Sequence, residues 1–248
     1  MLAFDDILPA GALAGTVVLV HGFATNRAEC WRRLGWYGAF ERRGWRVVAP
    51  DLRGHGESAK PHEPEAYATR EMTGDILALV DHLGLERFDL VGYSMGASLA
   101  WAAALARPEP VNHLVLGGVG GGLLEKGPRL DLAAAMRADD PASITDPLAR
   151  GFRQFADEQG EDRLALAACA ERRGGTPPSG GRPPRLALPV LVIAGACDEI
   201  AGDPAPLAAA IGAGSKAVPG CDHFSAISNP LFKAAVMDFL DDWPEALD

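Results

Sequence analysis

Short apolar runs alternate with longer amphipathic stretches over most of this chain. The apolar runs are continuous rather than alternating with polar residues, which is typical of strands covered on both faces of a sheet. We predict six strands, at residues 16–20, 45–50, 88–92, 113–117, 190–195 and 216–219. The segment before residue 16 has room for little more than one further strand.

Helices are predicted between these strands from apolar residues at helical spacing. Residues 70–83 illustrate the pattern, with Met72, Ile76 and Leu79 on one face. The other predicted helices cover residues 27–43, 97–106, 206–211 and 231–243. Strands that alternate with helices predict an α/β fold, with a mostly parallel sheet and helices on both faces.

Residues 119–188 break this alternation. They contain three helical segments, at 130–137, 146–158 and 162–173, and they close with a Gly/Pro-rich return linker at 174–184. We predict a small helical lid insertion over the carboxyl edge of the sheet, because long connections in compact domains usually serve a function. The core of the fold would then be residues 1–118 and 189–248. A merely long crossover is the alternative.

Composition narrows the class of protein. The 248 residues are 48% apolar and carry a formal net charge of −10. An acidic surface disfavours nucleic acids and anionic membranes as partners, and we expect neither. The N-terminus lacks the pattern of a signal peptide, no run is long enough to span a membrane, and the four cysteines form no CxxC pair. We expect a cytoplasmic protein that acts on a small molecule. The sequence does not indicate its oligomeric state.

Gly92-Tyr93-Ser94-Met95-Gly96 is a G-x-S-x-G motif between a predicted strand and a predicted helix. The motif is weak by itself, but this placement makes a tight strand-to-helix turn that strains the serine backbone and exposes its hydroxyl. Glycines are required on both sides of Ser94, because a Cβ there would clash across the turn. We predict that Ser94 is a nucleophile.

A serine hydroxyl needs a base to react at neutral pH. His223 follows the predicted strand 216–219, whereas His113 begins a buried strand at the opposite end of the sheet. We therefore predict His223 as the base. Asp198 lies just past strand 190–195, where the sheet would hold it rigidly, and we predict that it orients His223. Glu199 and Asp203 are weaker candidates.

An oxyanion hole needs two N–H donors aimed at the developing charge. We predict the backbone N–H of Met95, which opens a helix, and that of Phe23, in the loop after the first long strand. His21 is expected to brace this loop. The segment with Asp51, Arg53 and His55 could form either a metal site or a loop held by turns and ion pairs. We favour the loop, because no second cluster of metal-ligand residues complements these three.

Together these motifs resemble the α/β-hydrolase superfamily, in its small single-domain serine esterase and lactonase-like form. The matching segments are HGF (21–23), PDLRGHGES (50–58), GYSMGA (92–97), GACD (195–198) and DHF (222–224), in the expected order and spacing. The resemblance implies the α/β-hydrolase fold and a serine hydrolase that cleaves a carboxylic ester, lactone or thioester through an acyl-enzyme. It implies no cofactor and no metal.

Other activities on this fold stay open. A carbon–carbon bond hydrolase, a lyase or a low-turnover ligand-binding module is compatible with the motifs. Dehalogenases and epoxide hydrolases of the superfamily place Asp at the position of Ser94, which argues against both here. Asp222 departs from the family, where Gly commonly precedes the histidine, and a carboxylate there predicts a raised pKa for His223.

Substrate-binding residues are predicted beside the nucleophile and on the lid. These are Tyr93, Phe224, Leu123, Leu124 and Met136. A pocket lined by them suggests small to medium, apolar or moderately polar acyl groups.

Overall fold

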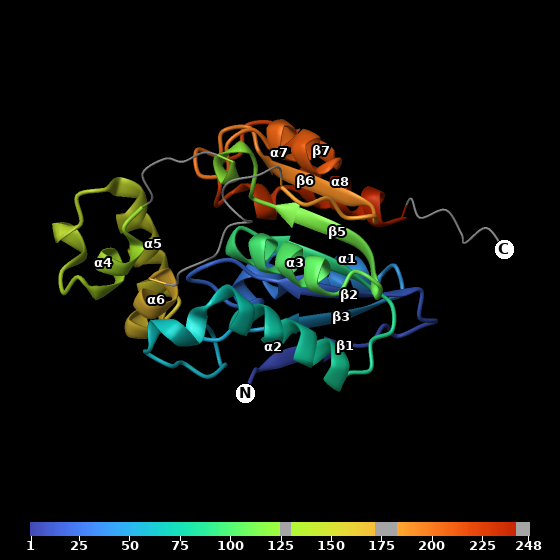
Figure 1. The fold of residues 1–248 in the computed structure, drawn as a ribbon, viewed down its shortest axis with the longest axis horizontal. Helices are drawn as coiled ribbons and strands as arrows, with labels where there is room; N and C mark the ends of the chain where they lie inside the picture. The colour runs from blue at the N-terminus through green and yellow to red at the C-terminus, as the bar shows by residue number, and fades with distance from the viewer. Residues whose placement is uncertain (125–129, 172–182, 242–248) are drawn as a thin grey trace.

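The computed structural model describes residues 1–124, 130–171 and 183–241. Seven strands form one sheet in the order β1-β3-β2-β4-β5-β6-β7, and every neighbouring pair is parallel except β1 with β3 (Figure 1). The strands are β1 Phe4–Ile7, β2 Gly15–Val20, β3 Trp45–Pro50, β4 Phe88–Tyr93, β5 Val111–Gly117, β6 Val190–Gly195 and β7 Gly214–Val218. The predicted mostly parallel sheet is thus confirmed, with β1 as the one strand that fits before residue 16.

Two apolar layers cover the sheet, because successive side chains of each strand point to opposite faces. Val18 and Leu90 pack with α2, α3 and α7 on one face, whereas Val17 and Val91 pack with α1 and α8 on the other. These helices are α1 Trp36–Glu41, α2 Thr69–His82, α3 Met95–Ala106, α7 Pro204–Ile211 and α8 Pro230–Asp241. Coverage of both faces explains why the central strands are continuously apolar in sequence.

Two predicted elements differ from the structure. Residues 27–43 form a π-helical turn, Ala28–Arg32, and the separate helix α1, because Gly35 adopts a left-handed conformation with φ 76° between them. Strand β7 is mostly exposed, since it forms one edge of the sheet and not a doubly covered position. The continuous apolar pattern therefore does not describe this strand.

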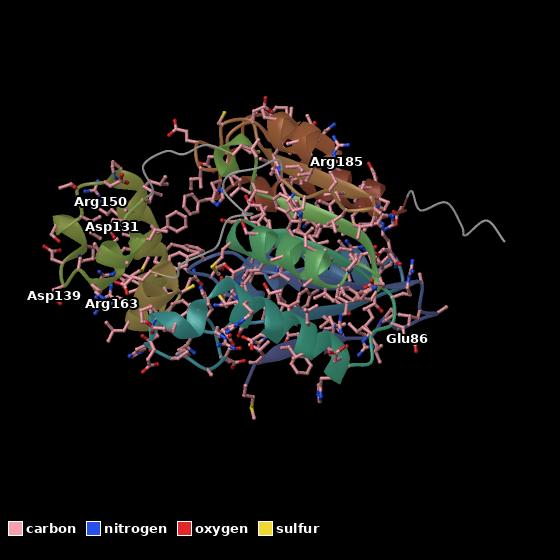
Figure 2. The ribbon with its side chains drawn as sticks, viewed as in Figure 1. Glu86, Asp131, Asp139, Arg150, Arg163 and Arg185 are labelled. Atoms are coloured by element: carbon pink, nitrogen blue, oxygen red, sulfur yellow. The ribbon has the colours of Figure 1, made fainter. Side chains whose placement is uncertain are left out.

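The described part of the insert between β5 and β6 contains three α-helices, α4 Leu132–Arg137, α5 Pro147–Glu158 and α6 Arg163–Ala170. Asp131, Asp146 and Asp162 cap them, each through a side-chain oxygen that accepts first-turn N–H groups. Figure 1 shows the three helices together at one end of the molecule, and Figure 2 shows Arg150 and Arg163 among their charged side chains, far from Glu86 at the opposite end. Most of the predicted return linker, residues 174–184, lies outside the described residues.

Candidate active site

Ser94 lies at the turn between β4 and α3, at the carboxyl edge of the sheet. Its backbone has φ 55° and ψ −117°, a strained conformation for a residue with a side chain. The turn is tight because a methyl group at Gly92 would overlap the backbone of Gly96, and one at Gly96 would overlap the carbonyl oxygens of Val20 and His21. The sequence motif thus forms the strained turn that its spacing predicts.

His223 links Ser94 to Asp198 through its two ring nitrogens. Nε2 lies 2.9 Å from Oγ of Ser94, and Nδ1 lies 2.8 Å from Oδ2 of Asp198. With the ring proton on Nδ1, the ring donates to Asp198 and accepts from the serine hydroxyl. This chain of hydrogen bonds can move a proton from Ser94 to His223 while the carboxylate stabilises the resulting imidazolium.

The sheet and its loops hold both partners of Ser94 in place. Asp198 is buried after β6, and its second oxygen, Oδ1, accepts from the backbone N–H groups of Ile200 and Ala201 at 3.0 and 2.8 Å. The hydroxyl of Tyr93 donates to the carbonyl oxygen of His223 at 2.6 Å. Tyr93, predicted from sequence as a substrate-binding residue, therefore also fixes the histidine loop from β4.

The carboxylate of Asp222 accepts hydrogen bonds from residues of its own loop. Oδ1 accepts from the hydroxyl and N–H of Ser225 at 2.6 and 2.8 Å, and from the N–H of Phe224 at 3.1 Å. The hydrogen bonds from Ser225 lower the pKa of the Asp222 carboxyl below its ordinary value. None of these contacts tests the effect of the Asp222 carboxylate on His223, which stays a prediction.

The loop after β2 runs close beside the nucleophile. A methyl group at Gly22 would lie 3.4 Å from Cβ of Ser94, so this backbone touches the serine. Helix α3 begins at Met95, and N–H groups in the first turn of a helix have no acceptor within that helix. The backbone of Gly22, which precedes Phe23, and the start of α3 at Met95 thus both lie beside Ser94.

A buried histidine and a half-buried ion pair brace the loops. Nε2 of His21 accepts from the N–H of Leu52 at 2.9 Å, and burial lowers the pKa of His21 to about 4. Arg53 forms a two-point ion pair with Asp75 at 2.6 and 2.7 Å, which agrees with a loop held by charge pairs. Within the described residues no group of three or more His, Cys, Asp or Glu side chains could hold a metal ion.

A cavity of about 470 Å³ opens beside the serine. Its floor includes Ser94 and His223, and its wall on the insert side comes from α5, through Phe152 and Phe155. The ring of Phe152 lies 5.2 Å from that of Phe224 and 6.1 Å from that of Phe23, between ring centres. Helix α5 therefore forms one wall of the cavity, and aromatic side chains line it, Phe23, Tyr93, Phe152, Phe155 and Phe224.

The lid residues predicted to bind substrate lie elsewhere. Leu123, Leu124 and Met136 are not among the residues that line this cavity. Met136 is fully buried among the helices of the insert, and Leu124 is exposed. This corrects the expectation that they line the pocket beside Ser94, because α5 and not α4 turns its apolar face toward the serine. Phe152 and Phe155 were missed, although their helical spacing marks an apolar face.

A family model described as alpha/beta hydrolase fold matches residues 15–159, more than half of the chain. The chain belongs to this family. Segments of it are also similar to epoxide hydrolases. It is 38% identical over 99 residues to epoxide hydrolase 3 of Siraitia grosvenorii and 41% identical over 97 residues to an epoxide hydrolase of Caballeronia sordidicola. These matches cover 40% and 39% of this chain but 30% and 29% of those proteins, so they span under a third of the relatives' length.

Solved α/β-hydrolases resemble the chain over almost all of its length. A hydrolase from Pseudomonas aeruginosa PA01 superposes with a TM-score of 0.75 and 26% identity, covering 96% of this chain and 94% of that one. The enol-lactonase of Burkholderia xenovorans LB400 superposes with a TM-score of 0.77 and 24% identity, covering 97% and 96%. The second likeness establishes the fold alone. No helix of this α/β-hydrolase, within its described parts, is long and apolar enough to cross a membrane.

Proposed function

We propose that this chain is a serine hydrolase that cleaves a carboxylic ester, or a related lactone or thioester, of a small to medium substrate. The observation that carries the proposal is the hydrogen-bonded series Ser94–His223–Asp198, with distances of 2.9 and 2.8 Å. A nucleophile, a base and a group that orients the base are the parts that acyl transfer requires.

Acylation begins when Oγ of Ser94 bonds to the substrate carbonyl carbon and its proton moves to Nε2 of His223. The bond to the leaving oxygen then breaks, and His223 returns the proton to that oxygen, so that an alcohol departs. Water next attacks the acyl-enzyme and gives its proton to His223. The bond between the acyl carbon and Oγ breaks, Ser94 regains its proton, and the acid leaves.

The negative charge on the carbonyl oxygen is placed between the backbone N–H groups of Phe23 and Met95. The closeness of the Gly22 backbone to Ser94 and the start of α3 at Met95 support this assignment. Fixed N–H donors stabilise an oxyanion more than a neutral carbonyl, and loss of one such donor typically costs about 10²–10³ in kcat. No cofactor takes part in these steps.

The aromatic cavity limits the acyl group to small or medium size. About 470 Å³ lies within the range of small-molecule sites, and Phe23, Phe152 and Phe224 give it apolar walls. We propose that the helices α4–α6 act as a lid over the acyl group, within an insert of residues 119–188, because α5 supplies the wall opposite the sheet.

Epoxide hydrolysis is the second candidate, since the relatives of 38% and 41% identity bear that name. Chemistry argues against it. Opening of an epoxide by a serine oxygen would leave an ether, which water cannot cleave by attack at a carbonyl carbon. A carboxylate nucleophile instead forms an ester that water can hydrolyse. The hydroxyl of Ser94 therefore favours acyl transfer.

The test is hydrolysis of p-nitrophenyl acetate and butyrate by the wild type, Ser94→Ala and the control Ser98→Ala. Ser98 lies one helical turn further along α3, so its replacement controls for loss of a nearby hydroxyl. We expect turnover by the wild type and by Ser98→Ala, and a kcat lower by about 10³ or more in Ser94→Ala. Mass spectrometry of the wild type at short times should show the protein plus one butyryl group.

Two results would contradict the proposal. Ester turnover that survives in Ser94→Ala would remove the assigned nucleophile. Turnover of styrene oxide by the folded wild type, with no turnover of either ester, would replace ester cleavage with epoxide hydrolysis.

A further inference from the structure

Among the described residues, the charged side chains that line the cavity beside Ser94 are all negative. Glu29 and Glu158 both line it, and among the described residues no lysine or arginine does. Glu29 comes from the π-helical turn after β2, and Glu158 ends α5, so the two carboxylates reach the cavity from the core and from the insert. Because both carboxylates line one cavity of about 470 Å³, a charge bound there lies in the field of both, which salt screens over a Debye length of about 10 Å at 0.1 M.

The arginine nearest to Glu29 does not cancel this field inside the cavity. Nη1 of Arg33 lies 2.9 Å from Oε1 of Glu29, one helical turn away. The Arg33 side chain is 72% exposed and does not line the cavity, whereas Glu29 is 17% exposed and does. Water screens the guanidinium more strongly than the carboxylate, because screening grows with exposure.

Helix α5 adds to the negative potential. Its C-terminal half, from Gly151 to Glu158, lines the cavity, and a helix C-terminus carries partial negative charge. The arginines of α5 bond elsewhere. Nη1 of Arg153 donates to the carbonyl oxygens of Ala135 and Ala138, and Arg150 donates to a backbone oxygen before the helix.

Aromatic faces complete the environment. Phe152, Phe155 and Phe224 meet at the cavity, with ring centres 5.2 and 6.4 Å from that of Phe224. Phenyl faces attract a cation through the ring quadrupole, and the attraction is stronger where the contact is shielded from water. A substrate carboxylate in this cavity would lose part of its hydration. No lysine or arginine among the described residues lines the cavity to form an ion pair with it.

We propose that the acyl group hydrolysed at Ser94 carries a positive charge on an apolar body, as a quaternary ammonium does. The preference rests on the proposed function, because it concerns the acyl group of that same reaction. Phe152, Phe155 and Phe224 enclose the apolar part, and Glu29 and Glu158 supply the counter-charge. Substrates whose acyl group ends in a carboxylate are disfavoured.

The experiment compares three p-nitrophenyl esters of nearly equal shape. These are 4-(trimethylammonio)butyrate, which is cationic, 5,5-dimethylhexanoate, its neutral isostere, and hemiglutarate, which is anionic. We expect kcat/KM to fall in that order, with about tenfold or more between the cation and the anion. The advantage of the cation should shrink as salt rises from about 0.05 to 0.5 M, because ions screen the field of both carboxylates. Rates in Ser94→Ala provide the background.

Variants that each remove one carboxylate charge test whether Glu29 and Glu158 cause the preference for a cationic acyl group. Glu29→Gln should lower the ratio of cationic to neutral kcat/KM by about threefold, and Glu158→Gln should lower it by less, because water screens the charge of the exposed Glu158 more strongly. Glu65→Gln is the matched control, because it removes the same charge at a residue that does not line the cavity. Equal ratios in all three variants would overturn the proposal, as would hemiglutarate turnover equal to that of the neutral ester.

Failure of this inference can be told apart from failure of the proposed function. If the three esters are hydrolysed equally and Ser94→Ala abolishes all turnover, the function stands and the charge preference falls. If the folded wild type hydrolyses none of them, calorimetric titration with phenyltrimethylammonium and with benzoate still measures the preference. Tighter binding of benzoate would overturn it, and tighter binding of the ammonium, lost in Glu29→Gln, would support it.

Discussion

Oε1 of Glu161 accepts a hydrogen bond of 3.0 Å from Nδ2 of Asn26, a residue 135 positions earlier in the chain. Oε2 of the same carboxylate accepts from the N–H of Gly56 at 2.9 Å. Glu161 is buried beside the start of α6, and burial raises the pKa of its carboxyl. One side chain of the insert thus ties together the loop that follows Phe23 and the loop that contains His55.

Removal of the Glu161 carboxylate should destabilise both the insert and the loop after β2. We expect Glu161→Ala to lower the free energy of unfolding by about 1–3 kcal/mol, because Asn26 and Gly56 lose a buried acceptor. We also expect a lower kcat for p-nitrophenyl butyrate, since Phe23 lies three residues before Asn26. Urea unfolding and steady-state rates measure both effects. Asp139→Ala, which removes an exposed carboxylate of the same insert, is the control, and equal losses in the two variants would contradict this role.

Asp198→Asn should lower kcat by about 10³–10⁴ without unfolding the protein. The backbone N–H groups of Ile200 and Ala201 hold one oxygen of residue 198, so an asparagine would keep its carbonyl there and turn its amide toward His223. The ring would then accept at Nδ1 and carry its proton on Nε2, where it could not take the proton of Ser94. Rates with p-nitrophenyl butyrate and an unchanged thermal midpoint would support this. A kcat near that of the wild type would exclude the proposed role of Asp198.

We predict that the folded protein loses stability in acid because of His21. Its folded pKa of about 4 lies below the ordinary value of 6.5 because the ring is fully buried, which disfavours the charged form. The unfolded chain therefore binds a proton first as the pH falls, so this contribution is present above pH 6.5 and is lost between pH 6.5 and about 4. The difference of about 2.5 pKa units corresponds to about 3 kcal/mol.

The measurement is urea unfolding at several pH values between 7 and 4. His21→Gln should be less stable at pH 7 and should lose less stability on acidification than the wild type. His82→Gln, at an exposed position of α2, controls for the loss of a histidine. If His21→Gln and the wild type lost stability in parallel, the linkage to His21 would be wrong.

Two Gly→Ala variants should have opposite effects. Gly96→Ala would push a methyl group into the carbonyl oxygens of Val20 and His21, and backbone cannot move aside cheaply, so we expect a loss of more than about 3 kcal/mol or no soluble protein. Gly74 lies exposed in α2 with open space around the same position, and Gly74→Ala should stabilise by about 0.5–1 kcal/mol. Thermal unfolding checks both. A Gly96→Ala protein as stable as the wild type would mean that α3 and β2 are less closely packed than described.

The sequence by itself determined the alternation of strands and helices, the turn at Ser94 and the loop positions of Asp198 and His223. Local chemistry accounts for this success. Doubly covered strands must be apolar throughout, and a strained turn between strand and helix requires glycines around the serine. Parallel strands also place their carboxyl ends at one edge, which predicts that residues 94, 198 and 223 lie near one another.

Tertiary structure alone decided which part of the insert faces the serine. Phe152 and Phe155 mark an apolar face of α5 in sequence, but the direction of that face depends on how the insert packs against the sheet. Met136 has an equally apolar pattern and is buried inside the insert instead. The tie between Asn26 and Glu161 is equally invisible in the sequence, because a hydrogen bond between residues 135 positions apart depends on the path of the whole chain.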